Sequence, residues 1–152
     1  MSHLPVRLQP GVDLRRSLEQ KGYALPTRSG FVVAGIGSLA CVSIRLAGED
    51  QETRRSGSFE LVSLSGTLSA RGAHLHMTIA NETGQVIGGH LGYGTVVRTT
   101  AEVLLVSLPD WHLTRAHDPA TGYQELLIRP GHRDQAARQK CQTSDPAGGN
   151  HP

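Results

Sequence analysis

Runs of alternating or β-branched apolar residues, separated by glycine, proline and asparagine, constrain this chain more than any other feature. Such runs predict strands, and the turn residues between them predict a hairpin-rich sheet. The run at 59–69 alternates well and contains Gly66, which indicates a bulge or a close approach between backbones. Further strands are predicted at 4–8, 74–80, 86–91, 95–108 and 123–128, with two more inside 31–46, where glycines are expected to form a bend or a tight turn.

One segment has helical character. Residues 12–21 place Leu14 and Leu18 on one face. Asp13 lies near the start, where its carboxylate suits the positive end of the helix dipole, and Gly22 is predicted to end the helix. One main helix among roughly seven strand signals predicts an α+β domain with a mostly antiparallel mixed sheet, and not a doubly wound fold.

The domain boundaries follow from turn signals and composition. Residues 111–122 contain Asp118-Pro119 and Thr121-Gly122 and are predicted to form a loop. The apolar pattern ends near residue 130, so we expect one domain over residues 4–130 and a disordered polar C-terminal tail over 131–152. A chain of 152 residues can bury a sizeable core in one such domain without disulfides or a structural metal.

Charge and cysteine content argue against several classes of protein. The net charge is only +2, and basic residues cluster only as Arg15-Arg16 and Arg54-Arg55, which disfavours a nucleic-acid partner. Cys41 and Cys141 make no disulfide framework, so a cytoplasmic, reducing setting is expected. No signal peptide is visible, and no apolar stretch approaches the ~20 residues that span a bilayer, so no membrane partner is expected.

Three histidines, His74, His76 and His90, carry the strongest chemical signal. His74 and His76 lie two residues apart on a predicted strand, so their side chains share a face. A three-residue hairpin loop at 82–84 would place His76 opposite His90, with Cβ atoms about 5 Å apart. A register slip of one residue would instead move His90 to the other face.

Three converging imidazoles form a ligand set for a divalent metal, with zinc, nickel, iron and manganese as candidates. A three-histidine site leaves a coordination position for water or substrate, as catalytic zinc sites do. Gly88 and Gly89 precede His90 and would let a neighbouring group or a ligand approach the backbone closely. The alternative is that the three are surface or hydrogen-bonded strand histidines that bind no metal.

Five motifs carry a family resemblance: RLQPG at 7–11, GSFELVSLSGTL at 57–68, HLH at 74–76, GGHL at 88–91 and TTAE at 99–102. Together they resemble the plants-and-prokaryotes-conserved domain family over roughly residues 4–128. The resemblance implies a trimer-forming α+β fold in which strands of neighbouring subunits extend one another's sheets. It also implies that the histidines lie near a subunit interface and hold a metal in some prokaryotic members.

In land plants the same domain is joined to AT-hook motifs, whose Arg-Gly-Arg-Pro core contacts the minor groove of DNA. This sequence lacks that core, since residues 128–133 read IRPGHR, and it resembles the stand-alone prokaryotic type. Where Ser58 stands here, the plant relatives carry an Arg that serves partner contacts. A DNA-binding regulator is therefore the weakest of the functional hypotheses.

Two hypotheses of different classes remain. The first is a binding or assembly module, a homotrimer that scaffolds a small ligand or a protein partner, with the metal structural or incidental. The second is a metal-dependent hydrolase or lyase, which would need a general acid or base near the metal. Glu60 and Glu102 are the candidates, because each is a carboxylate within an otherwise apolar strand. Either could instead pair with Arg45 or Arg98.

Overall fold

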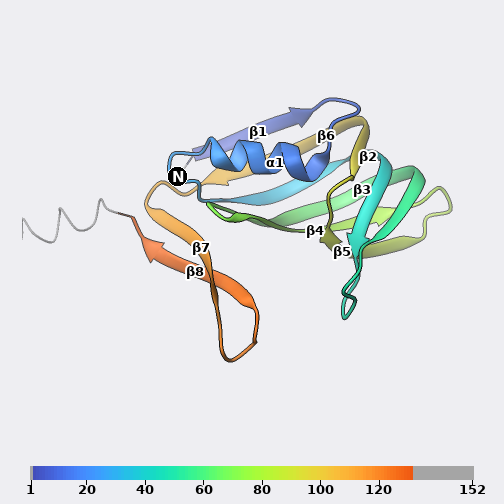
Figure 1. The fold of residues 1–152 in the computed structure, drawn as a ribbon. Helices are drawn as coiled ribbons and strands as arrows, with labels where there is room; N and C mark the ends of the chain where they lie inside the picture. The colour runs from blue at the N-terminus through green and yellow to red at the C-terminus, as the bar shows by residue number, and fades with distance from the viewer. Residues whose placement is uncertain (1, 132–152) are drawn as a thin grey trace, which may run out of the picture.

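A computed structural model describes residues 2–131 of the chain (Figure 1). In chain order the elements are β1 (Ser2–Leu8), α1 (Leu14–Tyr23), β2 (Gly30–Arg45), β3 (Thr53–Ser69), β4 (Gly72–Ala80), β5 (Val86–Leu91), β6 (Val96–Ser107), β7 (Trp111–His117) and β8 (Gln124–Pro130). Six strands form one sheet in the order β1-β6-β2-β3-β4-β5, and β7 and β8 form a second sheet of two strands.

The predicted α+β class with a largely antiparallel sheet and one helix is confirmed within residues 2–131. The sheet is not mixed, because every strand pairing in this part of the chain is antiparallel. An additional pairing joins β5 to the end of β2. As a result β2, β3, β4 and β5 form a closed circuit of hydrogen-bonded strands, and the end of β2 lies beside β5.

β2 is one strand, where two strands and a bend or tight turn were expected. Its ladders with β3 and β6 contain register shifts, and the strand is therefore bulged. Gly37 has a φ of 154°, and a Cβ there would overlap the carbonyl oxygen of Thr100 on β6. The glycines serve bulges and close strand contact, because a turn at this point would leave the facing backbone groups of β3 and β6 unpaired.

α1 packs its apolar face on the main sheet. The helix begins at Leu14, after Asp13, whose carboxylate accepts a hydrogen bond of 2.9 Å from the backbone N–H three residues further on. Leu14 and Leu18 are fully buried, as their spacing predicted. Gly22 does not end the helix. It is buried, and a Cβ on it would lie 3.2 Å from the Cβ of Leu68, so its lack of a side chain permits close packing of the helix on the sheet.

The hydrophobic core combines the buried face of α1 with alternate residues of the strands. On β4 these are Leu75, Met77 and Ile79, each at most 2% exposed. Because side chains alternate along a strand, His74 and His76 point to the opposite face of β4. Within residues 2–131, no helix is long and apolar enough to cross a membrane.

The β7–β8 hairpin extends from one end of the main sheet (Figure 1). Its first strand lies in the region predicted to be a loop, where only one residue, Leu113, is buried and no alternating apolar pattern marks the strand. The turn signals belong to the short connection between the two strands. Ser29, which is fully buried, joins the hairpin to the main fold because its Oγ accepts a hydrogen bond of 2.9 Å from the N–H of Leu113. Of the predicted disordered tail over residues 131–152, Gly131 is described: it is buried, and its N–H donates a hydrogen bond of 2.7 Å to the carbonyl oxygen of Asp110. Residues 132–152 lie outside the described residues.

Candidate metal centre

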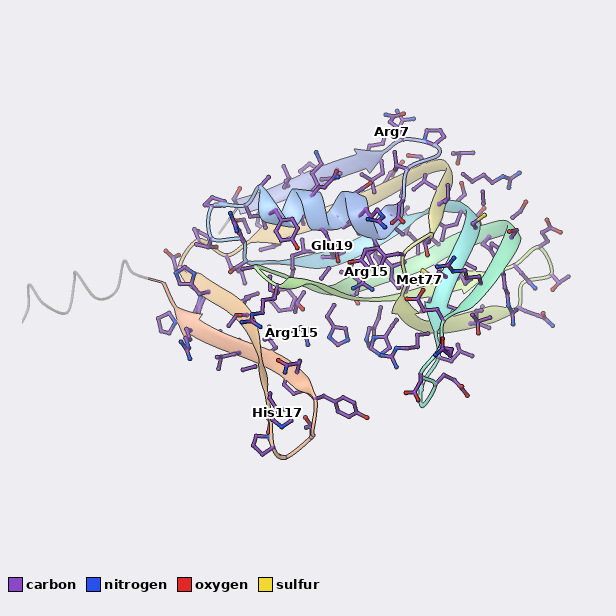
Figure 2. The ribbon with its side chains drawn as sticks, viewed as in Figure 1. Arg7, Arg15, Glu19, Met77, Arg115 and His117 are labelled. Atoms are coloured by element: carbon purple, nitrogen blue, oxygen red, sulfur yellow. The ribbon has the colours of Figure 1, made fainter. Side chains whose placement is uncertain are left out.

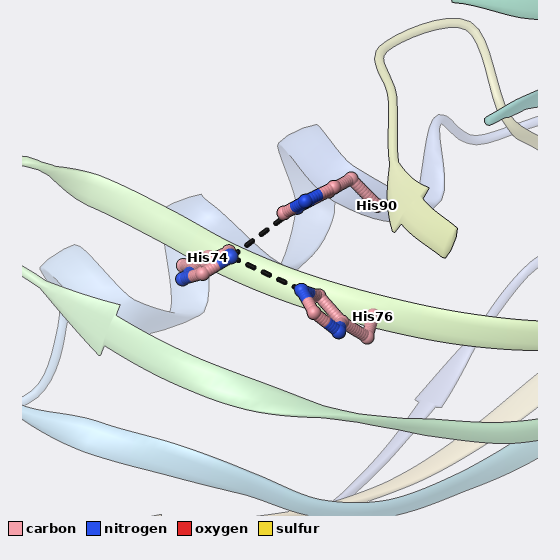
Figure 3. Close-up of side chains that lie close together, drawn as sticks. All are labelled: His74, His76 and His90. Carbon is pink, nitrogen blue, oxygen red and sulfur yellow. Dashed lines mark hydrogen bonds between the residues drawn. The ribbon is translucent and has the colours of Figure 1, made fainter. Parts of the chain in front are cut away.

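His74, His76 and His90 come together on one face of the β4–β5 hairpin (Figure 3). His76 pairs directly with His90 in the ladder, as the sequence predicted. The Nε2 atom of His74 lies 3.1 Å from Nε2 of His76 and 3.2 Å from Nδ1 of His90. One nitrogen from each of the three rings lies within 4.8 Å of the other two. His74 and His90 are partly buried, and His76 is exposed.

The two distances from His74 suit nitrogen ligands that share one cation. With metal–nitrogen bonds of about 2.0–2.1 Å, two nitrogens are about 3.3 Å apart in tetrahedral coordination and about 3.0 Å apart at right angles in octahedral coordination. The two distances from His74 lie between these values. Hydrogen bonding explains them less well, because a ring nitrogen carries one proton or one lone pair and Nε2 of His74 faces two neighbours. The donor set therefore fits a divalent metal.

The surroundings keep two of the imidazoles neutral. Burial, the guanidinium of Arg115 and the two neighbouring histidines lower the pKa of His74 from 6.5 to about 4, although Glu125 acts in the opposite direction. Burial and, next, the charge of Arg45 lower the pKa of His90. Metal binding requires the unprotonated ring, so both side chains are in the ligating form at neutral pH.

Two glycines let the strands around the histidines approach closely. A Cβ on Gly89 would lie 2.5 Å from the carbonyl oxygen of Arg45, at the point where β5 pairs with β2. A Cβ on Gly66 of β3 would overlap the carbonyl oxygen of His74. The predicted close approach is confirmed at both glycines, and the neighbouring group is backbone in each case.

A cleft of about 710 Å³ opens beside the three histidines, and His74 and His90 line it. Six charged residues line the same cleft: Arg15, Asp50, Arg45, Glu52, Arg115 and Glu125. They come from α1, from β2 and the loop after it, and from the β7–β8 hairpin. Sequence reasoning did not assign these residues to the site, because no local spacing links four separate segments.

Glu60 and Glu102, the predicted acid–base candidates, do not join the histidines. Both are exposed, and both line a separate cleft of about 410 Å³ together with Arg98. Within residues 2–131, neither glutamate forms an ion pair with that arginine or with Arg45. The carboxylates that do line the histidine cleft, in place of the two predicted glutamates, are Asp50, Glu52 and Glu125.

Residues 1–109 match the Plants and Prokaryotes Conserved (PCC) domain. The bifunctional protein GlmU of Synechococcus sp. (strain JA-2-3B'a(2-13)) is 44% identical over 126 residues, which are 83% of this chain and 20% of GlmU. The chain thus spans about a fifth of that relative's length. A solved structure from Salmonella enterica has a TM-score of 0.80 and 34% identity, and covers 85% of this chain and 94% of its own.

The fold is also shared with the metal-containing protein from Archaeoglobus fulgidus, at a TM-score of 0.63 and 24% identity, over 84% of this chain and 94% of that one. The matched domain runs from β1 past the end of β6 and includes all three histidines, while β7 and β8 follow it. The motifs around those histidines and the antiparallel sheet with its single described helix agree with the match. The chain belongs to the Plants and Prokaryotes Conserved (PCC) domain family.

Proposed function

We propose that this protein is a metal-binding PCC-domain module in which His74, His76 and His90 hold one divalent cation, with zinc as the first candidate. The observation that carries the proposal is the position of Nε2 of His74, 3.1 and 3.2 Å from one nitrogen of each of the other two rings. The metal content of the Archaeoglobus fulgidus protein, which shares the fold, supports it. A bound cation would supply Lewis acidity toward an oxygen ligand at its remaining coordination positions.

Elemental analysis of untagged protein, purified without chelator, tests the metal site. Near-stoichiometric metal in the wild type and none in the His74→Ala/His76→Ala double variant is the expected result. The His3→Ala/His117→Ala double variant is the matched control, because it removes two exposed histidines outside the centre and should keep its metal. A wild type that contains no metal, even after incubation with zinc, would mean that His74, His76 and His90 are ordinary strand histidines.

The module is further proposed to act as a homotrimer that binds a small ligand or a protein partner. Large apolar side chains on β2 and β3 support assembly, since Val33, Ile36 and Val62 are each at least 50% exposed. A groove of about 580 Å³, lined by residues of the neighbouring strands β1, β6 and β2, adjoins this region. Light scattering coupled to size exclusion should give three times the chain mass of 16.3 kDa, and a mass equal to one chain would contradict a trimer.

A metal-dependent hydrolase or lyase is the second candidate, favoured by the open cleft beside the histidines. Glu125 is then the better acid or base, because it lines the cleft together with His74 whereas Glu60 does not. Once an activity is found in the metal-loaded protein, Glu125→Gln should reduce kcat by about 100-fold or more. Glu60→Gln should leave kcat unchanged, and equal effects of the two substitutions would contradict this assignment.

DNA binding is the weakest proposal. The six charged residues at the histidine cleft are three arginines and three carboxylates, so the cleft is not a basic surface without its metal. A filter-binding assay at low salt should detect no affinity for duplex DNA, because phosphate contacts are strongest under that condition. Binding that weakens steeply with added salt would reopen the question.

A further inference from the structure

We infer that the small ligand of the histidine centre is an oxyanion, a carboxylate or a phosphate, held between the cation and the guanidinium groups of Arg45 and Arg115. This inference rests on the proposed metal function and names the class of ligand that the site would take. It is supported by the position of each arginine, by the lack of a charged partner for either, and by the charge that a bound cation would bring.

Arg45 faces the centre from the end of β2. It is the direct cross-strand partner of His90, so the two side chains share a face of the sheet. Its Nη1 donates a hydrogen bond of 3.1 Å to the carbonyl oxygen of Glu49. In the described part of the chain no carboxylate lies within ion-pair distance of this guanidinium.

Arg115 reaches the centre from the β7–β8 hairpin, and Figure 2 shows it between that hairpin and the main sheet. Its Nη2 donates a hydrogen bond of 3.2 Å to Oγ1 of Thr67, and its Nη1 donates one of 3.0 Å to the carbonyl oxygen of Gln124. Thr67 is the cross-strand partner of His74, so the guanidinium is held on the same face as the histidines. Across residues 2–131 it also forms no ion pair.

Arg15, the third arginine of the cleft, is already engaged. It forms an ion pair of 3.2 Å with Glu19 and donates to the carbonyl oxygens of Leu91 and Ala73. Arg45 and Arg115 therefore offer the unpaired guanidinium groups of the cleft. A guanidinium has five donors in a planar fork, which matches the oxygens of a carboxylate or a phosphate.

A bound cation would add to this positive charge. Three neutral imidazoles leave both charges of a divalent ion uncompensated, and no carboxylate of residues 2–131 joins the histidine group. Glu52 instead accepts a hydrogen bond of 2.6 Å from Ser43, and Glu125 accepts one of 3.0 Å from Thr121. An anionic ligand would balance the cation and the two arginines at once. The cleft, at about 710 Å³, has the size of a small-molecule site.

Isothermal titration calorimetry on the zinc-loaded full chain tests the inference, with inorganic phosphate and succinate as probes. We expect the wild type to bind at least one probe and Arg45→Gln and Arg115→Gln each to bind it about tenfold or more weakly. Arg115→Lys keeps the charge but loses the fork, and an intermediate affinity is expected. Arg98→Gln is the matched control, because that arginine lines the other cleft and its loss should leave affinity unchanged.

The outcomes separate this inference from the metal function beneath it. Binding of phosphate alone or of succinate alone supports the inference and assigns the ligand class. If the wild type holds zinc but binds neither probe, or if both glutamine variants bind as tightly as the wild type, the inference is wrong. A wild type that cannot be loaded with zinc overturns the metal function as well. Should circular dichroism show that Arg115→Gln is unfolded, Thr67→Val replaces it, because it removes one of the two hydrogen bonds that position Arg115 and leaves the arginine in place.

Discussion

His76 on β4 and His90 on β5 are direct partners in the antiparallel ladder, with ring centroids 4.4 Å apart and ring planes at 74°. His74, which precedes His76 on β4 and shares its face, stacks on the ring of His90, with ring centroids 5.0 Å apart and ring planes at 11°. His90 contacts both other rings and is the member supplied by the second strand. The three nitrogens therefore converge only while the hairpin keeps this register.

His90→Ala should weaken zinc binding by more than the roughly 10- to 100-fold cost of losing a supporting group outside the ligand shell. The reason is that the substitution removes one of the three proposed ligands. Competition with a chromogenic chelator measures the affinity. His117→Ala, which removes an exposed histidine of β7, is the control, and equal affinities in the two variants would argue against the site.

The metal-free protein should lose stability as the pH falls from about 6.5 to about 4. The folded state holds the pKa of His74 near 4, against 6.5 for an unperturbed histidine, so the unfolded state binds more protons throughout this interval. The free energy of unfolding must then decrease with decreasing pH and level off for this group below pH 4. Urea denaturation in EDTA between pH 7 and pH 4 measures it.

His74→Gln provides the control for that pH dependence. Glutamine cannot be protonated in this range, so the contribution of residue 74 to the slope should disappear. His90, whose pKa is also lowered, should leave a smaller slope in the same direction. Identical slopes in the wild type and His74→Gln would contradict the burial and the charge effects assigned to His74.

Gly89→Ala should destabilise the fold by about 1–3 kcal/mol, the usual cost of forcing an extra group into a packed contact. The added Cβ would lie 2.5 Å from the carbonyl oxygen of Arg45 and push β5 away from β2. Gly88→Ala is the neighbouring control, since its Cβ would lie 3.3 Å from the carbonyl oxygen of Met77 and requires a smaller adjustment. Urea denaturation compares the two, and a larger loss for Gly88→Ala would show that the contact is not critical.

Ser29→Ala should loosen the β7–β8 hairpin and cost about 1–3 kcal/mol, because the buried N–H of Leu113 would lose its acceptor. Hydrogen exchange followed by mass spectrometry should show faster exchange in β7 and β8 than in β4 and β5. Ser63→Ala, at an exposed position of β3, should change neither region. Uniform exchange across all four strands after Ser29→Ala would mean that the hairpin is not a separate unit of stability.

Sequence reasoning succeeded where the structural cause is local. The pairing of His76 with His90 follows from a loop of three residues and from the alternation of side chains along each strand. The buried face of α1 follows in the same way from the spacing of Leu14 and Leu18.

The predictions from the sequence were wrong where no local residue pattern identifies the role of a glycine or the presence of an exposed strand. Gly22 and Gly37 were interpreted as a helix stop and part of a bend or turn, but each makes room for a packed neighbour, Leu68 and Thr100 respectively. β7 was missed because its side chains are mostly exposed, so apolar alternation does not mark it. A glycine adopts a turn as readily as it admits a close contact, and only the packing partner distinguishes the two.

By itself, the sequence determined the α+β class and the three histidines on one face, because periodicity and short loops act over a few residues. Its motifs, and not its periodicity, carried the resemblance to the family. Tertiary structure alone decided what surrounds them. Arg45 faces the centre because the end of β2 pairs with β5. Arg115, on β7, faces it because its guanidinium donates a hydrogen bond to Thr67 on β3. These contacts join segments some 45 or more residues apart along the chain, and such contacts depend on how whole elements pack, which no local pattern encodes.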